Sequence, residues 1–177
     1  MKKMFFATIC SLFAPLFSCS REMPVNNTPV VSLDLQRYLG QWFEIARYNH
    51  HFEKGLTNST AAYSLTQDGT VKVVNGGYRD NQYHEAVGKA KTTNLPGLLQ
   101  VSFFGPFYSD YRVMYIDSDY TYALVGSKSS KYLWILSRFP VLPEGAEQLL
   151  LNEAKNRGYD TSSLIWVDQS RHMDGAE

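Results

Sequence analysis

The chain has 177 residues, with 17 lysines and arginines against 17 aspartates and glutamates, so its formal net charge is zero. A balanced charge without a basic run argues against a nucleic-acid partner, because such binding depends on a concentrated positive field. Aromatic residues make up 14% of the chain, and this enrichment favours β structure.

The first 18 residues have the pattern of an export signal. Two lysines are followed by an apolar run over residues 4–17, which suits a signal-peptide core and is short for a membrane span of about 20 residues. The run closes on Leu-Phe-Ser-Cys at residues 16–19. This stretch resembles a bacterial lipobox, whose cysteine is diacylated and becomes the new N-terminus. The pattern predicts a lipoprotein signal peptide over 1–18 and lipidation of Cys19.

Cysteine usage supports this prediction. Cleavage before Cys19 discards Cys10 and leaves one thiol, which cannot form an internal disulfide. Residues 19–32 contain prolines and polar residues and are predicted to be a flexible tether. Ser20, where an aspartate would favour inner-membrane retention, favours the outer membrane. We expect the lipid-anchored protein to face the periplasm. A secreted protein cut nearby and an uncleaved anchor are the alternatives.

Residues 33–177 have the size of one domain with its own core. Eight short alternating segments are separated by turn residues, at 41–48, 60–66, 70–78, 83–92, 98–104, 111–117, 120–127 and 131–138. Parallel crossovers need a dozen or more residues, so these tight turns indicate an antiparallel meander. An amphipathic pattern from about Pro143 to Gly158 predicts one helix, followed by a short strand at 164–167. We therefore expect an all-β fold: a closed eight-stranded up-and-down barrel with one C-terminal helix packed outside.

Three motifs that the meander brings to one rim resemble the conserved regions of the lipocalins. They are Gly40-Gln41-Trp42, the turn at 117–120 and Arg138. Longer stretches at 37–48, 52–56, 101–108 and 132–138 are similar to the bacterial outer-membrane lipoprotein branch, which is related to apolipoprotein D. The resemblance implies that Trp42 crosses the closed end with Arg138 over it, and that Gly40 and Asp119 belong to the same structural base.

Alternation and side-chain volume predict a cup rather than a filled barrel. An eight-stranded barrel either fills its interior or holds one small ligand, and the face that includes Trp42 carries many alanines and glycines. The predicted ligand-binding residues are Ala46, Tyr48, Tyr63, Val73, Ala90, Val101, Phe103, Tyr115 and Trp134. An apolar lining fits a long hydrocarbon chain, and the resemblance implies a fatty acid or a lysophospholipid as the ligand. The other interpretation turns the alanines outward beneath the helix.

Charged residues at the predicted mouth have two interpretations. In the first interpretation, five cations on or near that rim bind the phosphate or carboxylate head group of a lipid. In the second, they are solvated surface charges. They are Lys54, Arg79, Arg112, Lys128 and Lys131. Glu44 shares the inward face with Trp42, and we expect it to pair with a donor such as Arg138 or a tyrosine hydroxyl.

We expect no catalytic activity, no metal site and no cofactor. The mature barrel has no cysteine nucleophile, and no Ser-His-Asp order or zinc spacing stands out. Haem or tetrapyrrole binding through His50 or His51 is an alternative, as is a barrel that acts only as an interaction scaffold. The sequence leaves open whether two copies form a homodimer. We expect a lipid carrier anchored to the membrane through Cys19, which the resemblance links to membrane maintenance or stress.

Overall fold

The computed structural model describes residues 24–173, so the predicted signal peptide and Cys19 lie outside the described residues. Its elements in chain order are α1 (Leu35–Tyr38), β1 (Gly40–Arg47), β2 (Thr57–Leu65), β3 (Val71–Arg79), β4 (Gln82–Thr92), β5 (Leu98–Phe104), β6 (Phe107–Ile116), β7 (Tyr122–Gly126), β8 (Leu133–Ser137), α2 (Ala146–Asn156), a 3-10 turn (Thr161–Ser163), β9 (Ile165–Trp166) and α3 (Ser170–Met173).

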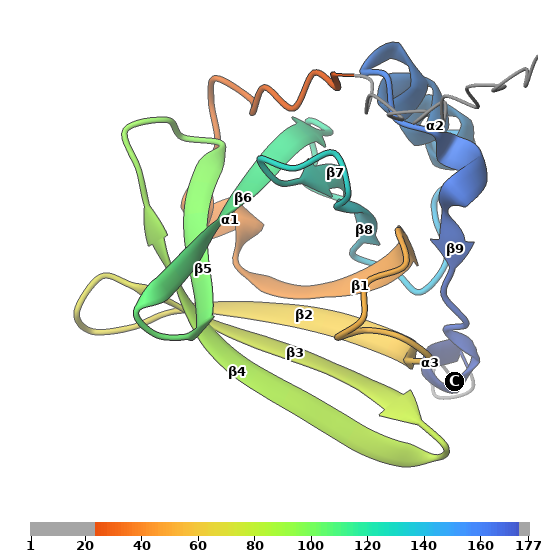
Figure 1. Cartoon of the computed structure of the whole chain (residues 1–177), viewed down its shortest axis with the longest axis horizontal. Helices are drawn as coiled ribbons and strands as arrows, with labels where there is room; N and C mark the ends of the chain where they lie inside the picture. The colour runs from red at the N-terminus through yellow and green to blue at the C-terminus, as the bar shows by residue number, and fades with distance from the viewer. Residues whose placement is uncertain (1–23, 174–177) are drawn as a thin grey trace, which may run out of the picture.

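Strands β1 to β8 form a closed antiparallel barrel. Each strand pairs with its neighbour in the chain, and β1 pairs with both β2 and β8, which closes the ring. The short strand β9 pairs with the last residues of β1, Ala46 and Arg47, along the edge of β1 opposite β8. Figure 1 shows the ring with α2 lying beside it. The predicted meander barrel with one helix outside is confirmed.

Helix α2 covers one side of the barrel wall. Ala146, Leu150 and Ala154 recur at every fourth position and are all buried, so one face of the helix is apolar. Gly145 precedes the helix with φ +76°, a left-handed conformation that suits glycine. The helix begins at Ala146, whose N–H donates to the Pro143 carbonyl at 3.1 Å.

The wall separates two apolar cores. The interior core lies inside the ring and has as its buried members Tyr38, Trp42, Ala61, Tyr63, Val71, Val73, Ala90, Leu99, Val113, Ala123, Val125 and Leu136. The helix-side core lies between the ring and α2 and contains Ile45, Ala46, Met114, Leu124, Leu133, Ile135, Leu150, Ala154, Tyr159 and Leu164. Side chains two apart on a strand share one face, so each regular strand contributes to the interior at alternate positions.

A β-bulge breaks that alternation in β1. The pairing of β1 with β8 shifts register between Glu44 and Ala46. The extra residue sends the following side chains to the opposite faces. Arg47, which lies opposite Trp134, therefore faces the barrel interior.

One part of the wall is not closed by hydrogen bonds. Within the described chain, β4 pairs with β5 over residues 89–92, whereas its earlier residues pair with β3 alone. The β3–β4 hairpin extends away from the ring at the lower right of Figure 1. The barrel is open between this hairpin and the β5–β6 turn, at the rim that carries the long loop 48–56.

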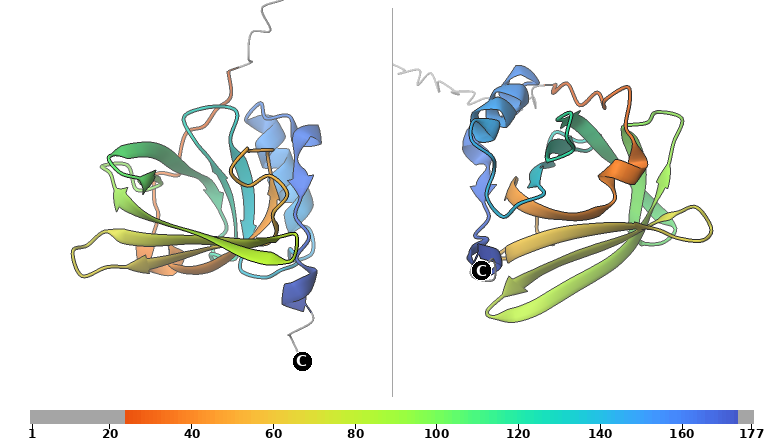
Figure 2. Two further views of the ribbon diagram at one scale, coloured as in Figure 1. Left: turned by 60° about the horizontal axis from the view of Figure 1, so that its bottom comes forward. Right: turned by 180° about the vertical axis from the view of Figure 1, so that it is seen from behind.

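Residues 24–32 lie against the barrel instead of forming a free tether. The N–H of Asn26 donates to the Arg157 carbonyl, and the N–H of Val30 to the Val113 carbonyl, each at 2.8 Å. Figure 2 shows this segment running beside the barrel and α2. The prediction of a flexible tether is therefore wrong for residues 24–32, and residues 19–23 lie outside the described residues. Among the helices of residues 24–173, none has the length and apolarity that crossing a membrane requires.

Candidate functional site

The closed end of the barrel is held by Trp42 and Arg138. The Arg138 guanidinium carbon lies 3.8 Å from the centre of the Trp42 ring, a cation–π contact. The guanidinium also donates to five backbone carbonyls, those of Arg37, Tyr38, Leu39, Gln41 and Tyr120. Gly40 has φ +93°, and a Cβ there would lie 3.3 Å from Arg138 Nη1. Three of the four residues that the resemblance implies, Gly40, Trp42 and Arg138, therefore meet at this end.

Asp119 is the exception in the predicted base. Its side chain is exposed, and its N–H donates to Asp117 Oδ2 at 3.1 Å. Asp117 Oδ1 accepts from the N–H groups of Thr121 and Tyr122 at 2.6 and 2.8 Å. An aspartate at the start of a turn can accept bonds from N–H groups further along. Asp117, and not Asp119, fixes this turn.

Six of the predicted pocket residues face the barrel interior. Tyr63, Val73 and Ala90 are buried members of the interior core, and Val101, Phe103 and Trp134 pack against it. They come from β2, β3, β4, β5 and β8. Regular alternation on these strands placed them correctly on the inner face.

The other three predicted pocket residues face α2. Ala46, Tyr48 and Tyr115 belong to or pack against the helix-side core. Ala46 and Tyr48 follow the β1 bulge, and Tyr115 follows a register shift between Val113 and Tyr115 in β6. The prediction for these residues is wrong, because it assumed unbroken alternation.

The barrel interior is filled at the closed end and open to solvent toward the mouth. Trp42 and Val113 have exposed fractions of 0%. Phe103 and Trp134 also face inward but are only half-buried, and Ala86, which lies opposite Asn75 on the inner face of β4, is exposed. Inward side chains of a closed, filled barrel would be buried. The cup therefore opens along β4.

The cup does not extend to the closed end of the barrel. Aromatic rings occupy its lower half, where the Tyr38 hydroxyl lies 2.6 Å and the Tyr63 hydroxyl 2.9 Å from the Tyr111 hydroxyl. Burial raises the pKa of all three hydroxyls, so they stay protonated. Two hollows, of about 500 and 330 Å³, lie outside the ring, under residues 26–32 and beside residues 140–145.

A buried polar group, which we call the mouth cluster, lies inside the open end of the barrel. Its members are Glu44, Arg47, His50, Glu53 and Trp134. Glu44 and Arg47 come from β1, Trp134 comes from β8, and the other two come from loop 48–56. The four ionisable members are all less than 10% exposed. Such a concentration of buried charge in a small barrel requires internal compensation.

Arg47 provides most of that compensation. Its Nη1 donates to Glu44 Oε1 at 2.5 Å. Its Nη2 donates to the backbone carbonyls of Glu53 and Leu56 at 2.8 and 3.0 Å, which fastens the mouth loop over the barrel. The Glu53 carboxylate accepts a hydrogen bond from Trp134 Nε1 at 3.1 Å. Glu44 therefore pairs with Arg47. The partner predicted from the sequence was Arg138 or a tyrosine hydroxyl.

Burial controls the protonation of the two carboxyl groups. It raises the pKa of Glu44 to about 8, with the charge of Glu53 adding to the rise and Arg47 opposing it. Burial also raises the pKa of Glu53, against the hydrogen bond from Trp134 and the charge of Arg47. The pair has one guanidinium for two carboxyl groups, so it retains a proton near neutral pH.

His50 is buried although it lies in the mouth loop, with 4% of its surface exposed. Its ring stacks on Phe52 at 5.2 Å and on Tyr132 at 5.0 Å between centroids. Burial and the charge of Arg47 lower its pKa to about 4, so the imidazole is neutral. Its Nε2 lies 3.7 Å from Glu53 Oε2 and has no hydrogen-bond partner among the described residues.

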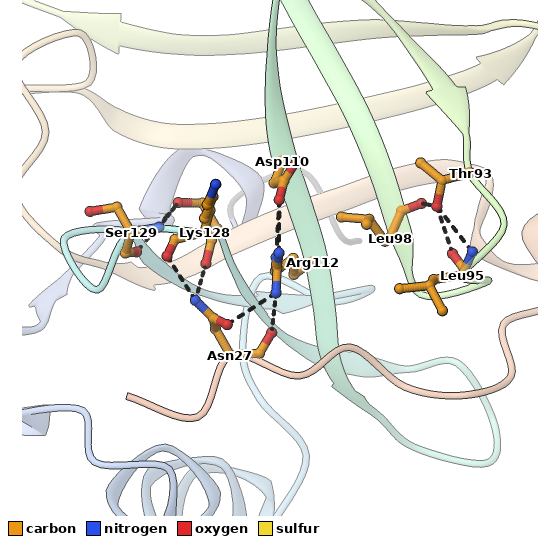
Figure 3. Close-up of polar contacts among 9 residues, drawn as sticks. Asn27, Thr93, Leu95, Leu98, Asp110, Arg112, Lys128 and Ser129 are labelled. Carbon is orange, nitrogen blue, oxygen red and sulfur yellow. Dashed lines mark hydrogen bonds and ion pairs between the residues drawn. The ribbon is translucent and has the colours of Figure 1, made fainter. Parts of the chain in front are cut away.

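The predicted rim cations do not act as one group. Figure 3 shows Arg112 bonded to Asp110 and to Asn27, so its guanidinium is already paired. Arg79 projects toward Gly55 of the mouth loop. Lys54 and Lys128 are exposed. These positions favour the solvated interpretation for the two lysines.

Sequence reasoning missed Arg47 and Glu53 as site residues. Arg47 lies on the wrong parity until the bulge is known, and loop residues such as Glu53 have no periodicity that predicts their direction. Glu53 lies within a stretch that carried the family resemblance, and this was the available signal. Within residues 24–173, no group of three or more His, Cys, Asp or Glu side chains has metal-binding geometry.

Comparison with known proteins gives a consistent picture. A family model described as a lipocalin-like domain matches residues 33–169. Outer membrane lipoprotein Blc of Escherichia coli (strain K12) is 45% identical over 157 residues, covering 86% of this chain and 89% of the relative. The protein of the same name from Vibrio cholerae is 41% identical over 93% of this chain and 97% of its own length.

More distant matches agree. Apolipoprotein D of Mus musculus is 31% identical over 97% of this chain and 96% of its own length. Among solved structures, the major allergen Per a 4 from cockroaches superposes with a TM-score of 0.68 and 21% identity. That match covers 83% of this chain and 95% of the allergen, and at this identity it shows the fold alone.

Proposed function

Because this chain belongs to the lipocalin family, whose members are generally binding or transport proteins rather than enzymes, we propose that it holds or carries fatty acids or lysophospholipids in the open half of its barrel. The relatives at 41% and 45% identity are named outer membrane lipoproteins, which supports the outer membrane as its location. In this proposal an acylated Cys19 provides the anchor, and the protein stores or moves lipid for membrane maintenance or stress.

The observation that carries this proposal is the half-exposed apolar inner face near the mouth. Val101, Phe103 and Trp134 face inward and remain accessible. Each buried CH₂ gains about 0.8 kcal/mol, so an acyl chain of about a dozen methylenes gains on the order of 10 kcal/mol before entropy losses. That gain is enough for a useful lipid affinity.

Two substitutions on neighbouring residues of β4 test the location of the chain. Ala86 lies on the inner face, and the adjacent Val87 points outward with 52% exposure. We expect A86F to weaken binding of a fluorescent C16 fatty acid about tenfold, or about 1.4 kcal/mol, because the ring occupies space that the chain needs. V87F should bind like the unmodified protein. Equal affinities of the two variants would place the lipid elsewhere.

The anchor is tested separately. C19A in the full chain should leave the protein in the soluble periplasmic fraction, and mass spectrometry should find no acyl modification. Retention of C19A in the membrane fraction would contradict lipidation as the anchor without affecting the barrel proposal.

A further inference from the structure

The Glu53 carboxylate is buried without sufficient compensation. Glu53 is 8% exposed, and within residues 24–173 its carboxylate accepts one hydrogen bond, from Trp134 Nε1 at 3.1 Å. An ionised carboxylate has about four acceptor sites. His50 Nε2 lies 3.7 Å from Glu53 Oε2, beyond hydrogen-bond distance, and itself has no hydrogen-bond partner among the described residues.

Arg47 does not neutralise this carboxylate directly. Its guanidinium bonds the Glu44 carboxylate and two backbone carbonyls. Two buried carboxyl groups therefore share one guanidinium whose hydrogen bonds go elsewhere. The titratable and charged groups around Glu53 are Glu44 and Arg47 of β1, Tyr63 of β2, Arg79 of β3, and His50 and His51 of the loop.

A buried carboxyl group in this state is stable with either a proton or a cation beside it. The neighbouring rings favour a cation, because aromatic faces attract ammonium groups. His50 lies 4.7 Å from Trp134 and 5.0 Å from Tyr132 between ring centres. Trp134 is half-buried and faces the interior, so the group lies at the edge of the open cup.

We propose that Glu53 and Trp134, with Glu44 behind them, form a cation subsite that takes the ammonium group of a single-chain amphiphile. The inference rests on the proposed lipid-binding function and specifies its head group. When the ammonium enters, the proton held by the carboxyl pair leaves to solvent, so charge balances. A carboxylate head group meets two buried carboxyl groups at this point, where the Arg47 guanidinium is already bonded, and it binds more weakly there. The Arg79 guanidinium, whose Nε has no hydrogen-bond partner among the described residues, lies beside Gly55 of the loop.

Three probes of equal chain length test the subsite: dodecylammonium, dodecanoate and dodecanol. At pH 8.5 the full-length protein should bind dodecylammonium at least about tenfold more tightly than dodecanoate. As the pH falls to 6.5, affinity for the ammonium should fall, by up to about tenfold per pH unit if one proton competes. Dodecanol affinity should stay constant. Calorimetry in two buffers of different ionisation enthalpy should show proton release with dodecylammonium only.

E53Q should bring the ammonium-to-carboxylate ratio close to one and abolish proton release, with dodecanol binding unchanged. E85Q is the matched control, because Glu85 is an exposed carboxylate of β4 outside the mouth cluster. A ratio near one in the unmodified protein, or the same ratio in E53Q, would overturn the inference while dodecanol binding upholds the lipid-binding proposal. Failure of all three probes to bind would overturn both. Retained dodecanol binding also shows that E53Q is folded.

Discussion

The two ends of the barrel differ in how the hydrogen bonding of their charged side chains is satisfied. At the closed end, the Arg138 guanidinium donates to five backbone carbonyls and covers Trp42, so its bonding is complete within the protein. At the mouth, the Glu53 carboxylate accepts one hydrogen bond from the described part of the chain. The difference separates a structural end, which needs no ligand, from the end at which we propose lipid binding, where Glu53 has acceptor capacity left.

The largest effect should come from the closed end. W42A removes a fully buried indole and the ring under Arg138. We expect it to lower the free energy of unfolding by about 3–5 kcal/mol, as for other buried aromatic residues, measured by chemical denaturation. W166A is the matched control, since Trp166 is 47% exposed, and it should cost far less. Similar losses in the two variants would contradict the structural role of this end.

The second effect comes from the mouth cluster and depends on pH. The folded pKa of Glu44 is about 8, against an ordinary 4.5, so between these values the folded state holds more protons than the unfolded state. Stability of the unmodified protein should therefore fall as pH rises from 5 to 8, by on the order of a few kcal/mol. E44Q should show a flatter profile in urea denaturation. A steeper or unchanged slope in E44Q would contradict the assignment.

A smaller effect is expected from the tyrosines of the barrel floor. Y111F removes the hydroxyl that bonds both Tyr38 and Tyr63, leaving two buried hydroxyls without that partner. The expected loss is about 1–3 kcal/mol. Y83F removes a hydroxyl from a ring that is 54% exposed and should change stability little. Equal stability of Y111F and the unmodified protein would show that these bonds contribute nothing.

The smallest effect should be at the N-terminal segment. The Asn27 side chain donates to the Ser127 and Lys128 carbonyls, partly in solvent. N27A should reduce stability by less than about 1 kcal/mol but speed amide exchange over residues 26–30. Unchanged exchange there would show that Asn27 does not hold the segment.

Regular alternation predicted the barrel, its order and the inward direction of residues such as Tyr63 and Phe103, because strands in a closed meander have few alternatives. The prediction failed at Ala46 and Tyr115, which follow register shifts in β1 and β6. One inserted residue moves the side chains after it to the opposite face of the strand, and the hydrophobic pattern of the sequence does not reveal the insertion. Glu44 was correctly placed inward. Its partner Arg47 and the loop residue Glu53 depend on tertiary geometry that periodicity does not contain.

The most direct measurement of the contrast between the two ends is hydrogen exchange of the full chain with and without saturating dodecylammonium. A ligand that completes the mouth should slow exchange in loop 48–56 and in β4 over residues 82–88, while amides of α1 and the start of β1 stay unchanged. Protection from exchange that is spread evenly over the barrel, or confined to the closed end, would contradict this contrast. In the contrast, the hydrogen bonding of the closed end is satisfied within the protein, and that of the mouth is satisfied by the ligand.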